Sequence, residues 1–196
     1  MDTVYFSTGN KDKLLISQII CSKFNIKVEQ VVAKIDEIQG EKSVFIAQDK
    51  ARRAYESSSK PIVISDDSWE ITALNGFPGP YMKSINKWFK PQDFIRLMSD
   101  IEDRRIILHQ FLVFYDGNIM KTFKNKIHGK ITDKPRGKNI QSPVMTVIEL
   151  EYDNGMTMAE VFELGKKVVA KRYLAHRDVW HKFSKWYYNQ NKISVK

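Results

Sequence analysis

The first third of the chain alternates short apolar segments with longer segments whose apolar residues recur at helical spacing. Short apolar runs are typical of buried strands, whereas recurrence every three to four residues indicates a helix that covers a sheet. The pattern predicts strands at 2–8, 27–33 and 61–65 and helices at 12–24 and 43–57. Strands separated by helices pair in parallel through crossover connections, so we expect a parallel sheet here.

The later part of the chain adds antiparallel pairing. Asp116-Gly117-Asn118 separates two strand-like segments, 105–115 and 119–128, and such a turn sequence is typical of a β-hairpin. Because hairpin strands are antiparallel, the sheet should be mixed. The other expected elements are an extended piece at 70–74, helices at 81–88 and 92–99, a strand at 143–152, and a helical segment from 158 onward that can contain a break.

Two adjacent carboxylates follow the apolar run Pro61-Ile62-Val63-Ile64, in the sequence Ser65-Asp66-Asp67-Ser68. We expect them at the end of a buried strand, where the sheet would support them at the mouth of a cleft. Paired carboxylates can hold a divalent cation or share general-base catalysis on a water molecule. For an Asp-Asp pair taken alone, the alternative is an acidic turn that only closes a strand.

A second polar segment follows the first predicted strand. Ser7-Thr8-Gly9-Asn10-Lys11-Asp12-Lys13 forms a glycine turn that leads into the helix predicted at 12–24. Free amides at the start of that helix, the Thr8 hydroxyl, the Asn10 amide and the Lys13 ammonium could together bind a phosphate. The spacing matches neither a Walker loop nor a dinucleotide fingerprint, and a turn that binds nothing is the alternative.

A third polar segment, Lys171-Arg172-Tyr173-Leu174-Ala175-His176-Arg177, lies near the C-terminus. On a helix, Lys171 and Ala175 share a face with the region of Asp178, and His176 and Arg177 lie beside it. Such a cluster suits an anionic or keto-bearing ligand, and a solvated basic helix surface is the alternative.

These segments belong to a longer series of motifs. A strand leads to T-G-N-x-x-K at 8–13, an acidic residue precedes Q-G-E at 37–41, and the acidic pair precedes A-L-x-G-x-P-G-x-Y at 73–81. Lys90-Pro91-Gln92-Asp93-Phe94, Glu102-Asp103, Gly129-Lys130-Ile131, Pro135-Arg136-Gly137 and Thr157-Met158-Ala159-Glu160 follow. In content and order, over nearly the whole chain, the series resembles the inosine triphosphate pyrophosphatases, which hydrolyse non-canonical purine nucleoside triphosphates to the monophosphate and pyrophosphate.

The resemblance implies a fold, a substrate and an assembly. The fold would be α/β, an elongated mixed β-sheet flanked by helices, with two lobes around a central nucleotide-binding cleft in a single domain over 1–196. The substrates would be inosine and xanthosine triphosphates and their deoxy forms, and the assembly a homodimer.

Resemblance and residue chemistry together assign roles in hydrolysis. Hard carboxylate and triphosphate oxygens suit Mg²⁺, with Mn²⁺ as a substitute. Glu37 would hold the ion directly or through water, Asp66 would support the metal shell, and Asp67 would bind the ion and deprotonate the attacking water. Adjacent carboxylates titrate as a coupled unit, so the separate roles of this pair stay open. Phosphate contacts are expected from Thr8, Asn10, Lys13 and Ser68, and Lys13 would also stabilise charge that develops at the α-phosphorus.

The expected base loop departs from the family pattern. The family usually has an aromatic-Gly-aromatic-Asp-Pro loop against the base, whereas this chain has Asn139-Ile140-Gln141-Ser142-Pro143. Gln141 and Ser142 would therefore contact the base through neutral hydrogen-bonding groups. The chain could alternatively bind nucleotides or a partner with little catalysis, or hydrolyse a different modified nucleotide.

The family's terminal K-x-x-x-S-H-R motif can be aligned in two ways. We prefer Lys171 with Ala175-His176-Arg177, which retains the histidine and brings Lys171, His176 and Arg177 to the base or its phosphates. The alternative pairs Lys166 with Ala170-Lys171-Arg172 and lies closer to Ala159-Glu160.

Composition agrees with an enzyme for a small anionic substrate. The net charge is +9, from 32 Lys and Arg against 23 Asp and Glu, which suits a triphosphate and would also suit nucleic acid. Trp180, Phe183 and Tyr187 recur at helical spacing, which favours packing over base stacking, so nucleic acid is not the expected partner. Cys21, the single cysteine, falls on an apolar helix face and is expected to be a core thiol. No apolar run approaches the length of a membrane span, so we expect no membrane partner and a cytoplasmic location.

Overall fold

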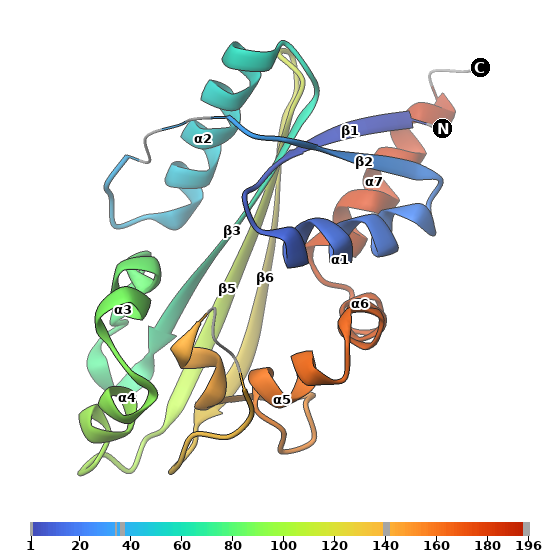
Figure 1. Ribbon diagram of the computed structural model, residues 1–196. Helices are drawn as coiled ribbons and strands as arrows, with labels where there is room; N and C mark the ends of the chain where they lie inside the picture. Colours follow the sequence, from blue (N-terminus) through green and yellow to red (C-terminus); the bar gives the residue numbers. More distant parts are fainter. Residues whose placement is uncertain (1, 34, 36–37, 139–141, 194–196) are drawn as a thin grey trace. The chain divides into compact units, whose positions relative to one another are not determined.

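The computed structural model describes residues 2–33, 35, 38–138 and 142–193, and it combines a mixed β-sheet with helices (Figure 1). The strands pair in the order β2-β1-β3-β5-β6-β7, and β4 pairs with β3. β1 is parallel to β2 and β3, whereas β4 is antiparallel to β3 and β7 to β6. The mixed α/β sheet predicted from the sequence is therefore confirmed. The strands are β1 (Asp2–Ser7), β2 (Ile26–Val31), β3 (Ile62–Ile71), β4 (Pro78–Gly79), β5 (Arg105–Tyr115), β6 (Met120–Ile131) and β7 (Ile148–Leu150).

Helices separate the strands in the first third of the chain, as the alternating pattern predicts. The α-helices are α1 (Lys11–Ser22), α2 (Ser43–Ser58), α3 (Met82–Trp88), α4 (Pro91–Leu97), α5 (Met158–Glu163), α6 (Lys166–Ala175) and α7 (Val179–Ile193). Short 3-10 helices are η1 (Thr72–Leu74) and η2 (Pro143–Thr146). Within the described residues, none of the helices has the length and apolar content needed to cross a membrane.

The chain divides into two compact units. Unit 1 comprises residues 1–66, 110–125 and 166–196, and unit 2 comprises residues 67–109 and 126–165. The chain passes between them within β3, β5 and β6, and again between α5 and α6. The single domain and the central nucleotide-binding cleft expected from the sequence stay predictions.

Helix α2 packs closely in unit 1 because its buried face is built from alanines. Ala47, Ala51 and Ala54 are fully buried and recur every three to four residues. They form one apolar cluster with Ile62 and Ile64 at the start of β3. Small side chains let the helix approach the strand closely while the isoleucines fill the space between them.

The C-terminal helix α7 supplies an aromatic cluster to unit 1. Phe183 is fully buried, and its ring centroid lies 5.5 Å from that of Tyr187 and 6.0 Å from those of Phe114 and Trp180. Trp180 also packs edge-on against Phe6 of β1, at 4.8 Å. The prediction that Trp180, Phe183 and Tyr187 serve packing is confirmed.

Cys21 is a core thiol, as predicted. The residue is fully buried on α1, and its Sγ lies 3.4 Å from the Ser184 hydroxyl on α7. Burial raises the pKa of the Cys21 thiol to about 12. Such a thiol is protonated at neutral pH and is not a nucleophile.

Unit 2 has its own core, built on one face of β5 and β6. Ile106 and Leu108 alternate with more exposed residues on β5, as do Ile127 and Ile131 on β6, and helix α4 covers them with Phe94. Alternation of this kind places every second side chain on the buried face.

Several predicted elements differ from the structure. The extended piece expected at 70–74 is the end of β3 followed by the 3-10 helix η1. The strand expected at 143–152 is divided into η2 and β7, because Pro143 occupies the first turn of η2 and cannot donate to a strand ladder. The segment after 158 is three helices, with breaks at Gly165 (φ +98°) and Arg177 (φ +51°). Positive φ values are incompatible with a continuing right-handed helix, so each residue ends the helix before it.

Candidate active site

The turn before α1 is organised by Asn10. Its side-chain oxygen accepts hydrogen bonds from the backbone N–H groups of Asp12 (2.9 Å) and Lys13 (3.1 Å), so Asn10 is the N-cap of the helix. The Thr8 Oγ1 in turn accepts from the Asn10 backbone N–H at 3.1 Å. The expectation of free amides at this helix start is thus wrong for Asp12 and Lys13, because the asparagine caps both.

The remaining donors of this turn still suit a phosphate. The Thr8 hydroxyl proton and the Asn10 side-chain NH₂ are not used in the capping bonds. Gly9 is exposed, and a Cβ placed on it would meet nothing within 4 Å. The chain's own packing therefore does not require glycine here, and the open space lets a ligand approach the backbone.

Lys166 reaches the same turn from another helix of unit 1. It is the first residue of α6, and its Nζ lies 2.9 Å from a carboxylate oxygen of Asp12 in the first turn of α1. Ala170 is fully buried on α6, which packs against α1. The alternative alignment, Lys166 with Ala170-Lys171-Arg172, thus has its lysine beside the turn before α1 and its small residue in the core.

The residues of the preferred alignment lie elsewhere in unit 1. Lys171, Ala175, His176 and Arg177 are all exposed. A helix advances about 1.5 Å per residue, so the end of α6 lies about 13.5 Å from Lys166 along its axis, and Lys171 is rotated about 140° from Lys166. Among the described residues, Lys166 makes an ion pair with Asp12, and the alignment through Lys171, His176 and Arg177 stays a prediction.

The acidic pair lies inside a strand, not at a strand end as predicted. β3 continues through Asp66 and Asp67 to Ile71, because Trp69 and Ile71 resume the apolar pattern and are buried in the core of unit 2. Asp66 belongs to unit 1, and Asp67 and Ser68 belong to unit 2. Both carboxylates are half-buried and Ser68 is buried. Successive side chains of a strand point to opposite faces, so β3 presents one carboxylate on each face.

The predicted metal set includes a residue that the structure does not describe. Glu37 lies outside the described residues, so its place relative to Asp66 and Asp67 is untested. Within the part of the chain that is described, no group of three or more His, Cys, Asp or Glu side chains could hold a metal ion. The two aspartates nevertheless supply only hard oxygen donors, which fit Mg²⁺ or Mn²⁺ better than a softer metal.

The loop expected to contact the base is described only in part. Gln141 lies outside the described residues, whereas Ser142 is half-buried and immediately precedes η2 in unit 2. The Ser142 carbonyl accepts from the Met145 N–H at 3.0 Å, which closes the first turn of η2. The Thr146 hydroxyl donates to the Pro143 carbonyl at 2.8 Å, so the end of this loop is a well-bonded turn.

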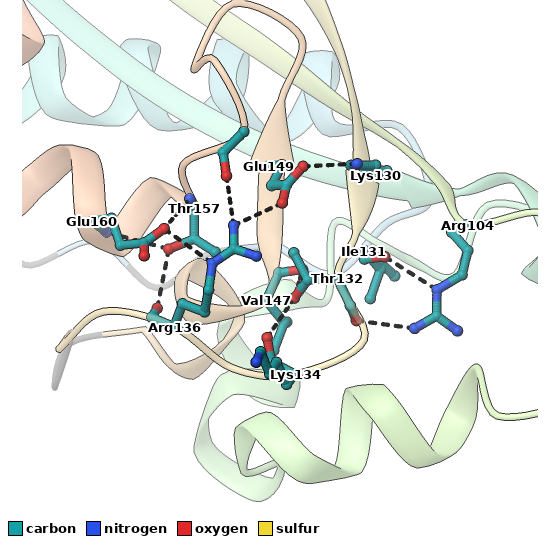
Figure 2. Close-up of polar contacts among 11 residues, drawn as sticks. Arg104, Lys130, Ile131, Thr132, Lys134, Arg136, Val147, Glu149, Thr157 and Glu160 are labelled. Atoms are coloured by element: carbon teal, nitrogen blue, oxygen red, sulfur yellow. Dashed lines mark hydrogen bonds and ion pairs between the residues drawn. The ribbon is translucent and has the colours of Figure 1, made fainter.

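Unit 2 also contains polar groups that the sequence did not identify as interacting. Arg136 makes ion pairs with Glu149 and Glu160 (Figure 2), and the His109 Nε2 lies 2.8 Å from a Glu70 carboxylate oxygen. The only signal in the sequence for Arg136 was its place in one motif, with Glu160 in another. Neither motif indicated that the two residues bind each other.

These features define a class of protein: an α/β protein with a polar, phosphate-compatible turn at α1 and half-buried carboxylates in the adjacent strand β3. The chain belongs to the Ham1 family, whose model matches residues 4–182. The homodimer and the cytoplasmic location expected from the sequence stay predictions.

Two proteins with similar sequences are both named dITP/XTP pyrophosphatase. A dITP/XTP pyrophosphatase of Methanopyrus kandleri is 30% identical over 188 residues, which cover 95% of this chain and 96% of that protein. A dITP/XTP pyrophosphatase of Saccharolobus solfataricus is 31% identical over 130 residues, 66% of this chain and 68% of that protein. The solved structure of a HAM1 protein from Coxiella burnetii superposes with a TM-score of 0.76, at 22% identity, over 94% of this chain and 98% of that chain. This last similarity supports the fold.

Proposed function

We propose that this protein hydrolyses non-canonical purine nucleoside triphosphates, such as those of inosine and xanthosine, to the nucleoside monophosphate and pyrophosphate in a reaction that requires Mg²⁺. The observation that carries the proposal is the family match over residues 4–182, together with full-length similarity to a protein named dITP/XTP pyrophosphatase. The capped turn at Thr8 and Asn10 supports it, because it offers donors for phosphate oxygens at a helix start.

The proposed reaction is an in-line displacement at the α-phosphorus. The oxygen of a water molecule forms a bond to this phosphorus while the bond from the phosphorus to the α–β bridging oxygen breaks. Pyrophosphate leaves with the electron pair, and Asp67 accepts the proton of the water. Thr8, Asn10 and Lys13 bind phosphate oxygens and orient them.

The metal would be held by carboxylates. Asp67 and Glu37 would bind Mg²⁺, and the ion would neutralise triphosphate charge when bound. Asp66 lies on the opposite face of β3 and would support the metal shell only indirectly. All of these ligands are hard oxygen donors, as Mg²⁺ prefers. The remaining positive charge near the phosphates would come from the lysines of unit 1.

A panel of nucleoside triphosphates with Mg²⁺ tests the reaction. We expect inosine and xanthosine triphosphates to be hydrolysed with higher kcat/KM than adenosine triphosphate, and we expect pyrophosphate and monophosphate as the first products. Chromatography of early time points identifies these products. Orthophosphate and a diphosphate as first products would contradict the proposed bond cleavage, and tight binding without hydrolysis would favour a nucleotide-binding protein.

Lys166 is proposed as a phosphate ligand in addition to Lys13. Its ion pair with Asp12, at 2.9 Å, already holds its ammonium beside the capped turn. Losing a hydrogen bond from a charged group costs roughly 1.5 to 3 kcal/mol, so Lys166→Met should raise KM about tenfold to a hundredfold. Steady-state kinetics with inosine triphosphate measures this change.

The neighbouring lysine provides a matched control. Lys167 is exposed on the same helix, so Lys167→Met removes an equal charge and should change KM less than about threefold. If instead Lys171→Met raises KM more than Lys166→Met does, the alignment through Lys171, His176 and Arg177 is the correct one.

A further inference from the structure

Arg136 connects separate segments of unit 2. Its Nη2 donates to a Glu149 carboxylate oxygen on β7 at 2.7 Å (Figure 2). It also donates to the Gly155 carbonyl at 2.6 Å. Its Nε donates to a Glu160 carboxylate oxygen on α5 at 3.3 Å, and its own carbonyl accepts from the Thr157 hydroxyl at 3.0 Å. The planar guanidinium reaches these acceptors from a single position.

The acceptors of Arg136 are themselves fixed. Glu160 and Thr157 form a reciprocal capping box, with the Thr157 N–H 2.7 Å from the Glu160 carboxylate and the Glu160 N–H 3.3 Å from the Thr157 hydroxyl. The backbone bond from Thr157 lowers the pKa of Glu160, so this carboxylate stays charged. Burial opposes ionisation of Glu149, but hydrogen bonds from Arg136 and Lys130 lower its pKa overall. Arg136 therefore faces charged, immobilised partners.

The residues after Arg136 bind the same helix. Gly137 has φ +77°, and a Cβ on it would lie 2.7 Å from the Glu160 backbone nitrogen, so only glycine fits this close approach. The Lys138 backbone N–H donates to the Glu163 carboxylate. Each of the residues 136–138 therefore contacts the segment that contains α5.

The far end of the base loop returns to Arg136. The Arg136 backbone N–H donates to the Thr146 carbonyl at 2.8 Å, and Thr146 is the last residue of η2. Ser142 immediately precedes η2. Arg136 therefore connects the segment before the loop, the 3-10 helix after it and α5.

We propose that Arg136 is a positioning residue that holds Ser142 against the base, so that it determines affinity for the purine and not the rate of the chemical step. The inference rests on the proposed function, because it assumes that Ser142 lies at the base. No atom of Arg136 needs to touch the substrate.

The test is Arg136→Lys, which keeps the charge but loses the forked geometry. We expect KM for inosine triphosphate to rise at least about tenfold with kcat changed less than about threefold, the tenfold corresponding to one charge-assisted hydrogen bond. KM for ribose 5-triphosphate, which has no base, should change less than about threefold. A purely structural role would lower the active fraction and so reduce kcat for both substrates.

Arg104 provides a matched control in the same unit. It donates to the backbone carbonyls of Ile131 (3.1 Å) and Thr132 (2.9 Å) (Figure 2) and to that of Met98 (2.8 Å). Arg104→Lys should lower the melting temperature and leave both KM values unchanged.

A second variant keeps the test decisive if Arg136→Lys fails to fold. Glu160→Gln retains an acceptor for the Thr157 N–H and removes the ion pair, so it should reproduce the selective rise in KM. Equal rises in KM for both substrates, or a fall in kcat alone, would overturn the proposal.

If the unaltered protein hydrolyses no triphosphate, the proposed function fails. Calorimetry with inosine monophosphate and ribose 5-phosphate then tests Arg136 by itself: selective weakening of the former supports positioning, and equal weakening overturns it.

Discussion

Replacing Asp67 with Asn should lower kcat for inosine triphosphate at least about a hundredfold and leave the protein folded. A positioned general base contributes about a hundredfold to ten-thousandfold to a rate, and the amide cannot accept the proton of the attacking water. The two side chains are nearly isosteric, and Asp67 is half-buried within β3, so the strand should tolerate the change. Pyrophosphate release at saturating Mg²⁺ measures the rate, and circular dichroism verifies the fold.

Asp66 provides the comparison within the same strand. If Asp66 supports the metal, Asp66→Asn should raise the Mg²⁺ concentration needed for half-maximal rate, and most of the activity should return at high Mg²⁺. The loss in Asp67→Asn should persist there. Near-normal turnover in Asp67→Asn would assign the base to another residue, and full rescue by Mg²⁺ would make Asp67 a metal ligand only.

Elements with regular side-chain periodicity were predictable from the sequence. The strand predicted at 105–115 coincides with β5, and the turn at Asp116-Gly117-Asn118 forms where expected: the Asp116 carboxylate accepts from the backbone N–H groups of Asn118 and Ile119. Local side-chain chemistry determines such a turn, and alternation determines the strands beside it. Local sequence rules therefore predict this strand and this turn.

The acidic pair could not be placed by the same rules. Consecutive polar residues after an apolar run normally signal the end of a strand, yet β3 continues through Asp66 and Asp67. The strand continues because Trp69 and Ile71 are buried in a second core, and this tertiary burial overrides the local signal. The pattern of a single sequence does not show that one strand contributes side chains to two hydrophobic cores.

The terminal lysine motif shows a different limit. The motif match in the sequence favoured Lys171, because that alignment keeps a histidine. In the structure, however, Lys166 lies beside Asp12. The two alignments differ in burial, since Ala170 is buried and Ala175 is exposed, and burial depends on which helix face meets α1. Sequence spacing alone could not decide between them.

Replacing Phe183 with Ala should cause the largest loss of stability among the substitutions considered. The ring is fully buried and contacts Phe114, Phe123, Trp180, Trp186 and Tyr187 at centroid distances between 5.5 and 6.4 Å. Truncating a buried Phe to Ala costs about 3 to 5 kcal/mol, because the transfer free energy is lost and a cavity remains. For a chain of this size, the melting temperature should fall by about 6 to 20 °C. Differential scanning calorimetry measures the shift.

Phe45 provides the matched control for this substitution. It is also a phenylalanine of unit 1, but it is 57% exposed on α2, with the Lys42 ammonium 5.6 Å from its ring centroid. Surface substitutions usually change stability by less than about 0.5 kcal/mol, so Phe45→Ala should barely move the melting temperature. Equal shifts for the two variants would mean that the aromatic cluster on α7 is not the core of unit 1. A large shift for Phe183→Ala alone shows that the buried contacts of α7 stabilise unit 1, since both variants lose the same ring and only one loses buried contacts.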